Sequence, residues 1–232
     1  KKFIRVYIRI ATAPSALTDI IANGDDLNSY TARIRLATDR TLELWSETAK
    51  IGASSSALAL DTWYRVELVY DDSIADNTTE GYLDGTQFAT GTGTDTVGNG
   101  RVRIGIITST TADVYFDDIG INDSSGTSQT GLPGAGSIVH MQPNAAGDNA
   151  LPVGLFSDID EITPDDATTI AVIQVTTNIG DYNCESSSSA GVGASDTVTL
   201  VQVGIRFAMV SAASANFILR IKSQSGGTLL SS

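Results

Sequence analysis

A short acidic segment, Asp158-Ile159-Asp160-Glu161, is the part of the sequence that comes nearest to the carboxylate pair of a glycosidase. A retaining glycosidase needs two carboxylates roughly 5 Å apart across the scissile bond. On a strand, side-chain alternation would place Asp158 and Asp160 on one face, about 6.6 Å apart. The segment nevertheless lies outside the N-terminal sandwich predicted below. We therefore interpret it as surface charge, and we predict that the chain is not an enzyme.

His140 is the single histidine. A Ser-His-Asp triad needs an oriented nucleophile, and the sequence offers no Gly-x-Ser-x-Gly elbow to present one. One imidazole also cannot form a transition-metal site by itself. The sequence therefore predicts a structural role for His140.

Aspartates in two segments could supply oxygen ligands to Ca²⁺, a hard cation that prefers such ligands: Asp71, Asp72, Asp76, Asp117 and Asp118. The first three begin a loop between two expected strands, and the last two lie in a later strand. The spacing is not that of an EF-hand, and aspartates are ordinary in turns. Asp117 and Asp118 could instead brace their strand through backbone hydrogen bonds. Ca²⁺ is thus the one candidate cofactor.

Two aromatic residues, Trp45 and Tyr30, are the candidates for a ring surface on which a sugar could stack. Alternation places Trp45 on the strand face opposite Leu42 and Leu44, so its ring is expected to be exposed. The pattern makes Trp45 and Tyr30 the candidate carbohydrate-binding residues.

Composition excludes some partners. The formal net charge is -13, whereas nucleic-acid binding depends on clustered Lys and Arg. Anionic membrane surfaces are disfavoured for the same reason. The single cysteine, Cys184, excludes an internal disulfide. We expect neither a nucleic-acid nor a membrane partner.

Short strands separated by turn residues predict an almost wholly β protein. In residues 3–10, Ile4, Val6, Ile8 and Ile10 share one face. Residues 30–36 and 41–46 alternate in the same way, and residues 54–60, 101–107 and 114–121 are further expected strands. Residues 13–26 are expected to form a connector. In the strand that begins at Trp63, the even positions face the core while Arg65 and Glu67 should stay in water.

The pattern of short alternating strands stops at residues 123–136, which are rich in turn formers and therefore predict a linker. We therefore predict a first domain over residues 1–122 and a second, smaller β-sandwich-like module over residues 137–232. Expected strands in the second module lie at residues 137–141, 170–175, 197–210 and 216–222, with a loop over 142–151.

Three pieces in this order resemble the last strands of concanavalin A-like (laminin-G-like) jelly rolls: Trp63-Tyr64-Arg65-Val66, Tyr82-Leu83-Asp84-Gly85 and Phe116-Asp117-Asp118-Ile119. The resemblance implies a jelly-roll sandwich in which Trp63 packs in or beside the core. It also implies Ca²⁺ at one rim, as such domains often have. Asp84-Gly85 is itself a tight-turn signal, because primed turns need positive φ.

A further resemblance extends beyond the sandwich. Residues 116–126, followed by Leu132-Pro133-Gly134 and Ile138-Val139, are similar to a run in bacteriophage virion proteins. This implies a structural protein of a phage-like virion, such as a capsid decoration, fibre or tail component. It would dock to other virion proteins and to copies of itself at the particle surface.

The alternative is an extracellular carbohydrate-binding, lectin-like module whose partner is a cell-surface glycan. The two readings are compatible, because phage tails often carry glycan-binding sandwiches. A third reading, a glucanase-like hydrolase, requires paired carboxylates in the sandwich groove, and the sequence does not reveal them.

Overall fold

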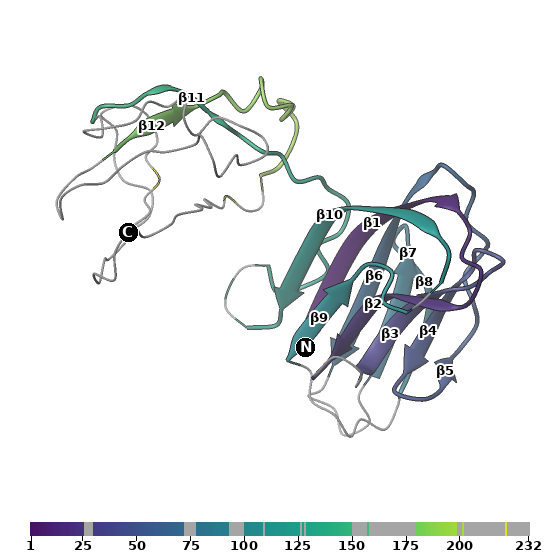
Figure 1. Ribbon diagram of the computed structural model, residues 1–232. Helices are drawn as coiled ribbons and strands as arrows, with labels where there is room; N and C mark the ends of the chain where they lie inside the picture. Colours follow the sequence, from purple (N-terminus) through teal and green to yellow (C-terminus); the bar gives the residue numbers. More distant parts are fainter. Residues whose placement is uncertain are drawn as a thin grey trace, which may run out of the picture. The chain divides into compact units, whose positions relative to one another are not determined.

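The computed structural model describes residues 1–25, 30–71, 78–92, 100–108, 110–125, 127, 129–149, 157, 180–198, 201 and 221. The chain divides into two compact units, Lys1–Ile138 and Val139–Ser232. The described regular structure consists of β-strands (Figure 1). In these residues no helix has the length and apolar character needed to cross a bilayer.

The first unit consists of two five-stranded antiparallel sheets (Figure 1). In spatial order, the first sheet contains β10 (Asp113–Asp123), β1 (Lys2–Thr12), β6 (Trp63–Asp71), β7 (Thr78–Leu83) and β8 (Thr86–Thr92). The second contains β5 (Lys50–Ile51), β4 (Leu42–Ser46), β3 (Tyr30–Leu36), β2 (Thr18–Gly24) and β9 (Arg101–Ile104). This arrangement is a jelly-roll β-sandwich, which confirms the predicted fold class of this unit.

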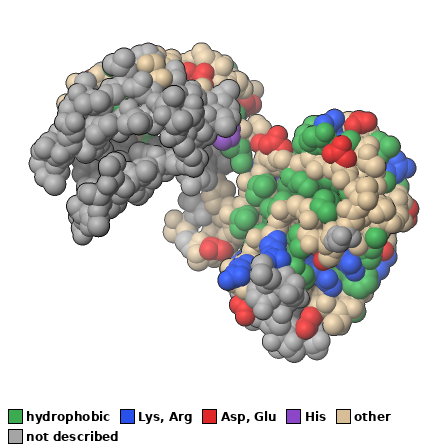
Figure 2. Space-filling view, viewed as in Figure 1, with side chains coloured by type: hydrophobic (Ala, Val, Ile, Leu, Met, Phe, Trp, Pro, Cys, Tyr) green, Lys and Arg blue, Asp and Glu red, His purple; other side chains and the backbone are tan. Residues whose placement is uncertain are grey.

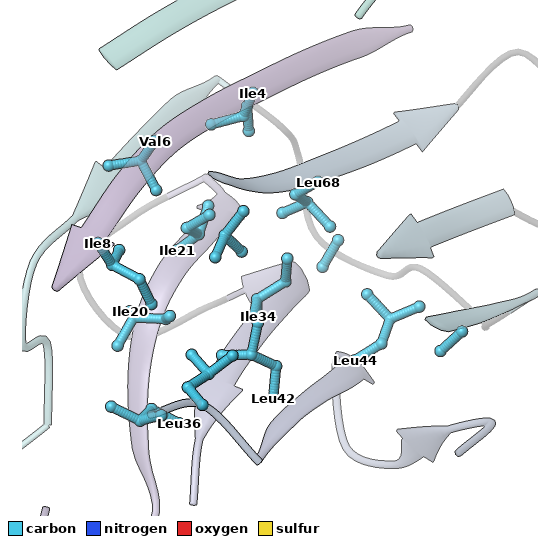
Figure 3. Packing of buried hydrophobic residues seen from close by; sticks show 14 of the residues in the cluster. Ile4, Val6, Ile8, Ile20, Ile21, Ile34, Leu36, Leu42, Leu44 and Leu68 are labelled. Carbon is cyan, nitrogen blue, oxygen red and sulfur yellow. The ribbon is translucent and has the colours of Figure 1, made fainter. Parts of the chain in front are cut away.

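The core lies between the inner faces of the two sheets. Ile4, Val6, Ile8 and Ile10 of β1 are fully buried, as their alternation predicts. Figure 3 shows Ile4, Val6 and Ile8 facing side chains of the second sheet, including Ile20, Ile21, Ile34, Leu36, Leu42 and Leu44. Burying each such side chain contributes about 1.5–3 kcal/mol of transfer free energy. The predicted hairpin is also present, since Asp84 and Gly85 have φ angles of 50° and 85° between β7 and β8.

Residues 13–26 are not a simple connector, because they contain the completely buried strand β2. A bulge between Asp19 and Ile21 breaks the two-residue period, so that Ile20 and Ile21 are both buried. Polar residues in this strand further obscure the pattern, but each finds a hydrogen-bond or ion-pair partner, Thr18 with Thr108 beyond β9 and Asp19 with arginines of β3. Asn23 donates through Nδ2 to Thr31 Oγ1 at 2.9 Å.

Two other strand predictions are wrong. Residues 54–60 form no strand; Ser55 instead hydrogen-bonds Leu42 through both its backbone and its side chain. Residues 137–141 are also irregular, and the strand β11 (Pro143–Ala146) lies where a loop was expected. It pairs with β12 (Tyr182–Cys184). The other strands predicted for the second unit fall largely outside the described residues, so its sandwich-like character stays a prediction.

The segment predicted as a linker belongs to the first unit and covers part of the first sheet. Gly134 donates its N–H to Glu67 Oε1 at 3.1 Å and accepts a hydrogen bond from Arg5 Nη1 at 3.1 Å. Arg5 also donates to the Asp118 carbonyl at 3.0 and 3.1 Å, where a bulge gives Asp118 a φ of 48°. Glu67 is therefore only 1% exposed, contrary to the expectation that it stays in water.

We predict that Arg5→Ala lowers the free energy of unfolding by about 3 kcal/mol, because the substitution leaves the Asp118 and Gly134 carbonyls without the donor that now satisfies them. Arg9→Ala is the matched control on the same strand. Its ion pair with Asp61 is exposed, so its loss should cost less than about 1 kcal/mol. Urea unfolding followed by tryptophan fluorescence measures both, and equal costs would show that the covering segment does not contribute as described.

Candidate functional site

The outer side of the second sheet presents a row of long side chains, which we call the basic face: Tyr30, Arg33, Arg35, Trp45, Lys50, Arg101 and Arg103, with Asp19 and Glu43. The register pairs Ala22 with Arg103 on one side and with Arg33 on the other. Arg33 is then paired with Trp45, and Trp45 with Lys50. Ala22 is only 1% exposed, so the longer side chains beside it must cover it.

Cation–π contacts join the two predicted aromatic residues through arginines. The Arg33 guanidinium carbon lies 5.6 Å from the ring centroid of Tyr30 and 5.9 Å from that of Trp45. The Arg35 guanidinium carbon lies 4.7 Å from the ring centroid of Trp45, and the Arg103 guanidinium carbon lies 5.8 Å from that of Tyr30. Arg103 Nη1 also donates to the Tyr30 hydroxyl at 3.0 Å. Each cation–π contact is worth about 0.5–2 kcal/mol, depending on its solvation.

A buried carboxylate, that of Asp19, positions two of these arginines, Arg33 and Arg35. The Asp19 side chain is 1% exposed, and it lies 2.8 Å from Arg35 Nε and 3.4 Å from Arg33 Nη1. The Arg35 contact is an ion pair without the alignment of a hydrogen bond. Arg33 Nη2 also donates to the Glu47 carbonyl at 3.0 Å. A carboxylate removed from water requires such compensation, so Asp19 fixes both guanidinium groups.

Glu43 orients the Trp45 ring from the other side. The Trp45 indole N–H donates to Glu43 Oε2 at 2.9 Å, and Lys50 Nζ lies 2.9 Å from Glu43 Oε1. Partial burial alone would raise the pKa of Glu43, but the hydrogen bonds from Lys50 and Trp45 outweigh burial and lower it. Lys50 also donates to Ser54 Oγ at 2.7 Å. The indole is therefore held by a charged partner.

The basic face contrasts with the rest of this acidic chain. The strands of the second sheet contain five basic residues, Arg33, Arg35, Lys50, Arg101 and Arg103, and two acidic ones, Asp19 and Glu43. The strands of the first sheet contain four basic residues, Lys2, Arg5, Arg9 and Arg65, and seven acidic ones, Glu67, Asp71, Glu80, Asp113, Asp117, Asp118 and Asp123. Figure 2 shows Lys and Arg side chains in the region where Figure 1 places β2, β3, β4 and β9.

The structure brings Tyr30 and Trp45 to one face, but sequence reasoning missed the residues that join them. The alternation of Arg33 with Arg35, and of Arg101 with Arg103, does indicate that each pair lies on one face of its strand. Asp19 gave no usable signal, because it lies in the segment predicted as a connector.

Among the predicted Ca²⁺ ligands that the structure describes, Asp71 lies far from Asp117 and Asp118. Asp71 Oδ2 lies 3.2 Å from Nζ of Lys1, the residue before β1, whereas Asp117 pairs with Tyr7 of β1. Six residues of strand separate these positions, or roughly 20 Å. Asp72 and Asp76 lie outside the described residues. In the described ranges, no three His, Cys, Asp or Glu side chains form a cluster suited to a metal ion.

Asp117 and Asp118 make the alternative contacts, those that brace a strand. Asp117 Oδ1 accepts from the Asp118 backbone N–H at 2.8 Å. Asp118 Oδ1 accepts from the Ile138 backbone N–H at 2.6 Å. Of the other predicted site residues, His140 is exposed, and the acidic segment at 158–161 lies outside the described residues.

Trp63 is on the surface rather than in the core, at 44% exposure. It pairs with Arg9, whose other strand neighbour is Tyr115, also 44% exposed. The Arg9 guanidinium carbon lies 4.3 Å from the Tyr115 ring centroid and 5.8 Å from that of Trp63. Alternation explains the error: Tyr64, Val66 and Leu68 point inward, so Trp63 must point outward. The first sheet thus has its own exposed aromatic cluster.

No family model matches this chain, and no curated protein matches it. Solved structures similar to it include Trypanosoma rangeli sialidase, at 18% identity and a TM-score of 0.41, over 52% of this chain and 20% of the sialidase. A heptameric SAP-like pentraxin from Limulus polyphemus is similar at 15% identity and a TM-score of 0.36, over 54% of this chain and 65% of the pentraxin. Ligand-free congerin I is similar at 14% identity and a TM-score of 0.35, over 52% of this chain and 90% of congerin I. These similarities concern the fold alone. The chain spans one fifth of the sialidase.

The Glu43 contacts predict a pH effect on stability. A carboxyl whose pKa is lower in the folded protein than its ordinary 4.5 stabilises the fold above that value, and the contribution is lost as the pH falls through the folded pKa. Between about pH 5 and pH 2, wild-type protein should therefore lose more unfolding free energy than Glu43→Gln. Urea unfolding at stepped pH tests this, and parallel curves for the two proteins would contradict it.

Proposed function

We propose that this chain is a carbohydrate-binding, lectin-like β-sandwich module, and that the basic face is its binding site. The observation that carries the proposal is the pair of partly exposed rings, Tyr30 and Trp45, held on one face with Arg33 between them. Aromatic rings offer apolar surface to the C–H face of a sugar, with a polar tip for hydroxyl groups. The neighbouring guanidinium groups add several fixed hydrogen-bond donors.

The proposed role is binding without catalysis. Both carboxylates of the basic face are already engaged, Asp19 with Arg33 and Arg35, and Glu43 with Lys50 and Trp45. A glycosidase acid or nucleophile must instead face its substrate. We place the module outside the cell or at a particle surface, with a cell-surface glycan as partner.

A second candidate role is docking within a phage-like virion, to its other proteins or to copies of this chain. The observation that favours it is the exposed cluster of Trp63, Arg9 and Tyr115 on the first sheet. Aromatic residues and Arg are enriched in the energetically important parts of protein interfaces. The two roles use opposite sheets, so they can be tested separately.

We predict that Trp45→Ala reduces saccharide affinity about five- to thirtyfold, because one stacked ring contributes on the order of 1–2 kcal/mol. Trp63→Ala is the matched control, since it removes the same side chain from the other sheet. A glycan array followed by isothermal titration calorimetry of the best saccharide measures both variants, and circular dichroism checks their folding.

The two variants separate the candidate roles. If only Trp63→Ala weakens saccharide binding, the basic face is not the site. If no saccharide binds and the protein assembles through the cluster around Trp63, the docking role replaces the proposed one.

A further inference from the structure

We propose that the saccharide bound by the basic face is anionic and carries carboxylate or sulfate groups. This inference rests on the proposed function and specifies its ligand class. The strands of the second sheet have an excess of three positive charges in a chain of net charge -13. A neutral sugar could accept hydrogen bonds from these groups, but it would gain no charge–charge attraction from them.

The position of the cations suits a charged oligosaccharide. Arg101 and Arg103 lie on the edge strand β9, and Lys50 lies on the opposite edge strand β5. Four inter-strand spacings separate β9 from β5, or about 19 Å. The face therefore presents basic groups at both ends and rings between them, which suits an extended chain better than a single sugar.

Arginine supplies the geometry for recognising carboxylate and sulfate. A guanidinium group offers parallel N–H donors that match two oxygens of one anionic group. Arg33 and Arg35 already face Asp19, and Arg103 donates to the Tyr30 hydroxyl. The exposed Arg101 at the edge of the sheet is therefore better placed for an anionic group of a ligand. The other contacts hold the rings, and Arg101 would engage the anion.

The net negative charge of the whole chain and the positive charge of the basic face have opposite effects on an anionic ligand. The negative chain as a whole repels an anion, but at physiological salt the interaction is screened beyond about 8 Å. The local field of the basic face then dominates at contact, while the acidic first sheet disfavours the same ligand. An anionic saccharide should therefore bind on one sheet only.

The test compares three saccharides of equal length by isothermal titration calorimetry with the full chain. The probes are an oligogalacturonate with carboxylates, a heparin-derived oligosaccharide with sulfates, and a neutral cello-oligosaccharide. At least one anionic probe should bind about tenfold tighter than the neutral one, because hydrogen bonds to charged groups are the stronger ones. The advantage should shrink as salt rises to about 0.5 M. The two anionic arms identify which group is recognised.

Arg101→Glu provides the variant test, with Arg9→Glu as a control that makes the same charge change on the other sheet. Arg101→Glu should weaken binding of the anionic probe severalfold and leave the neutral probe unchanged, whereas Arg9→Glu should alter neither. Equal affinity for neutral and anionic probes would overturn this inference and leave the proposed function standing. If no saccharide binds, both fail. Equally tight binding of single-stranded DNA would show a general polyanion surface and overturn the assignment to saccharide.

Discussion

The buried carboxylate of Asp19 is the constraint on which the candidate site depends. It lies directly opposite Arg35 in the sheet and also contacts Arg33, so one residue of β2 fixes two guanidinium groups of β3. Arg33 in turn lies between the rings of Tyr30 and Trp45. Without Asp19, the guanidinium groups of Arg33 and Arg35 would repel each other, and neither would be held in place against the rings.

The sandwich separates two kinds of surface. The inner faces share one apolar core, whereas the outer faces differ in the sign of their charge. Each outer face also has an aromatic and arginine cluster, one containing Trp45 and the other Trp63. The first sheet is partly covered by the chain around Gly134, which contacts Arg5 and Glu67. The basic face is thus the outer surface on which rings and excess positive charge coincide.

Much of the fold was predictable, because β1 and β3 alternate regularly and Asp84-Gly85 marks a tight turn. The strand β2 was missed because a bulge and buried polar residues conceal its period. The sequence identified Tyr30 and Trp45 as candidate residues, but not the contacts that join them. Those contacts depend on the register between β9, β2, β3 and β4, which alternation within one strand does not determine.

The most direct test uses the fact that the chain has two tryptophans, one on each outer face. A ¹⁵N-labelled sample should give two indole N–H signals in a ¹H–¹⁵N correlation spectrum, which Trp63→Phe assigns. Titration with the tightest-binding saccharide should shift the Trp45 signal, whose N–H donates to Glu43, and leave the Trp63 signal in place. Movement of the Trp63 signal alone would place the ligand on the first sheet and contradict the account.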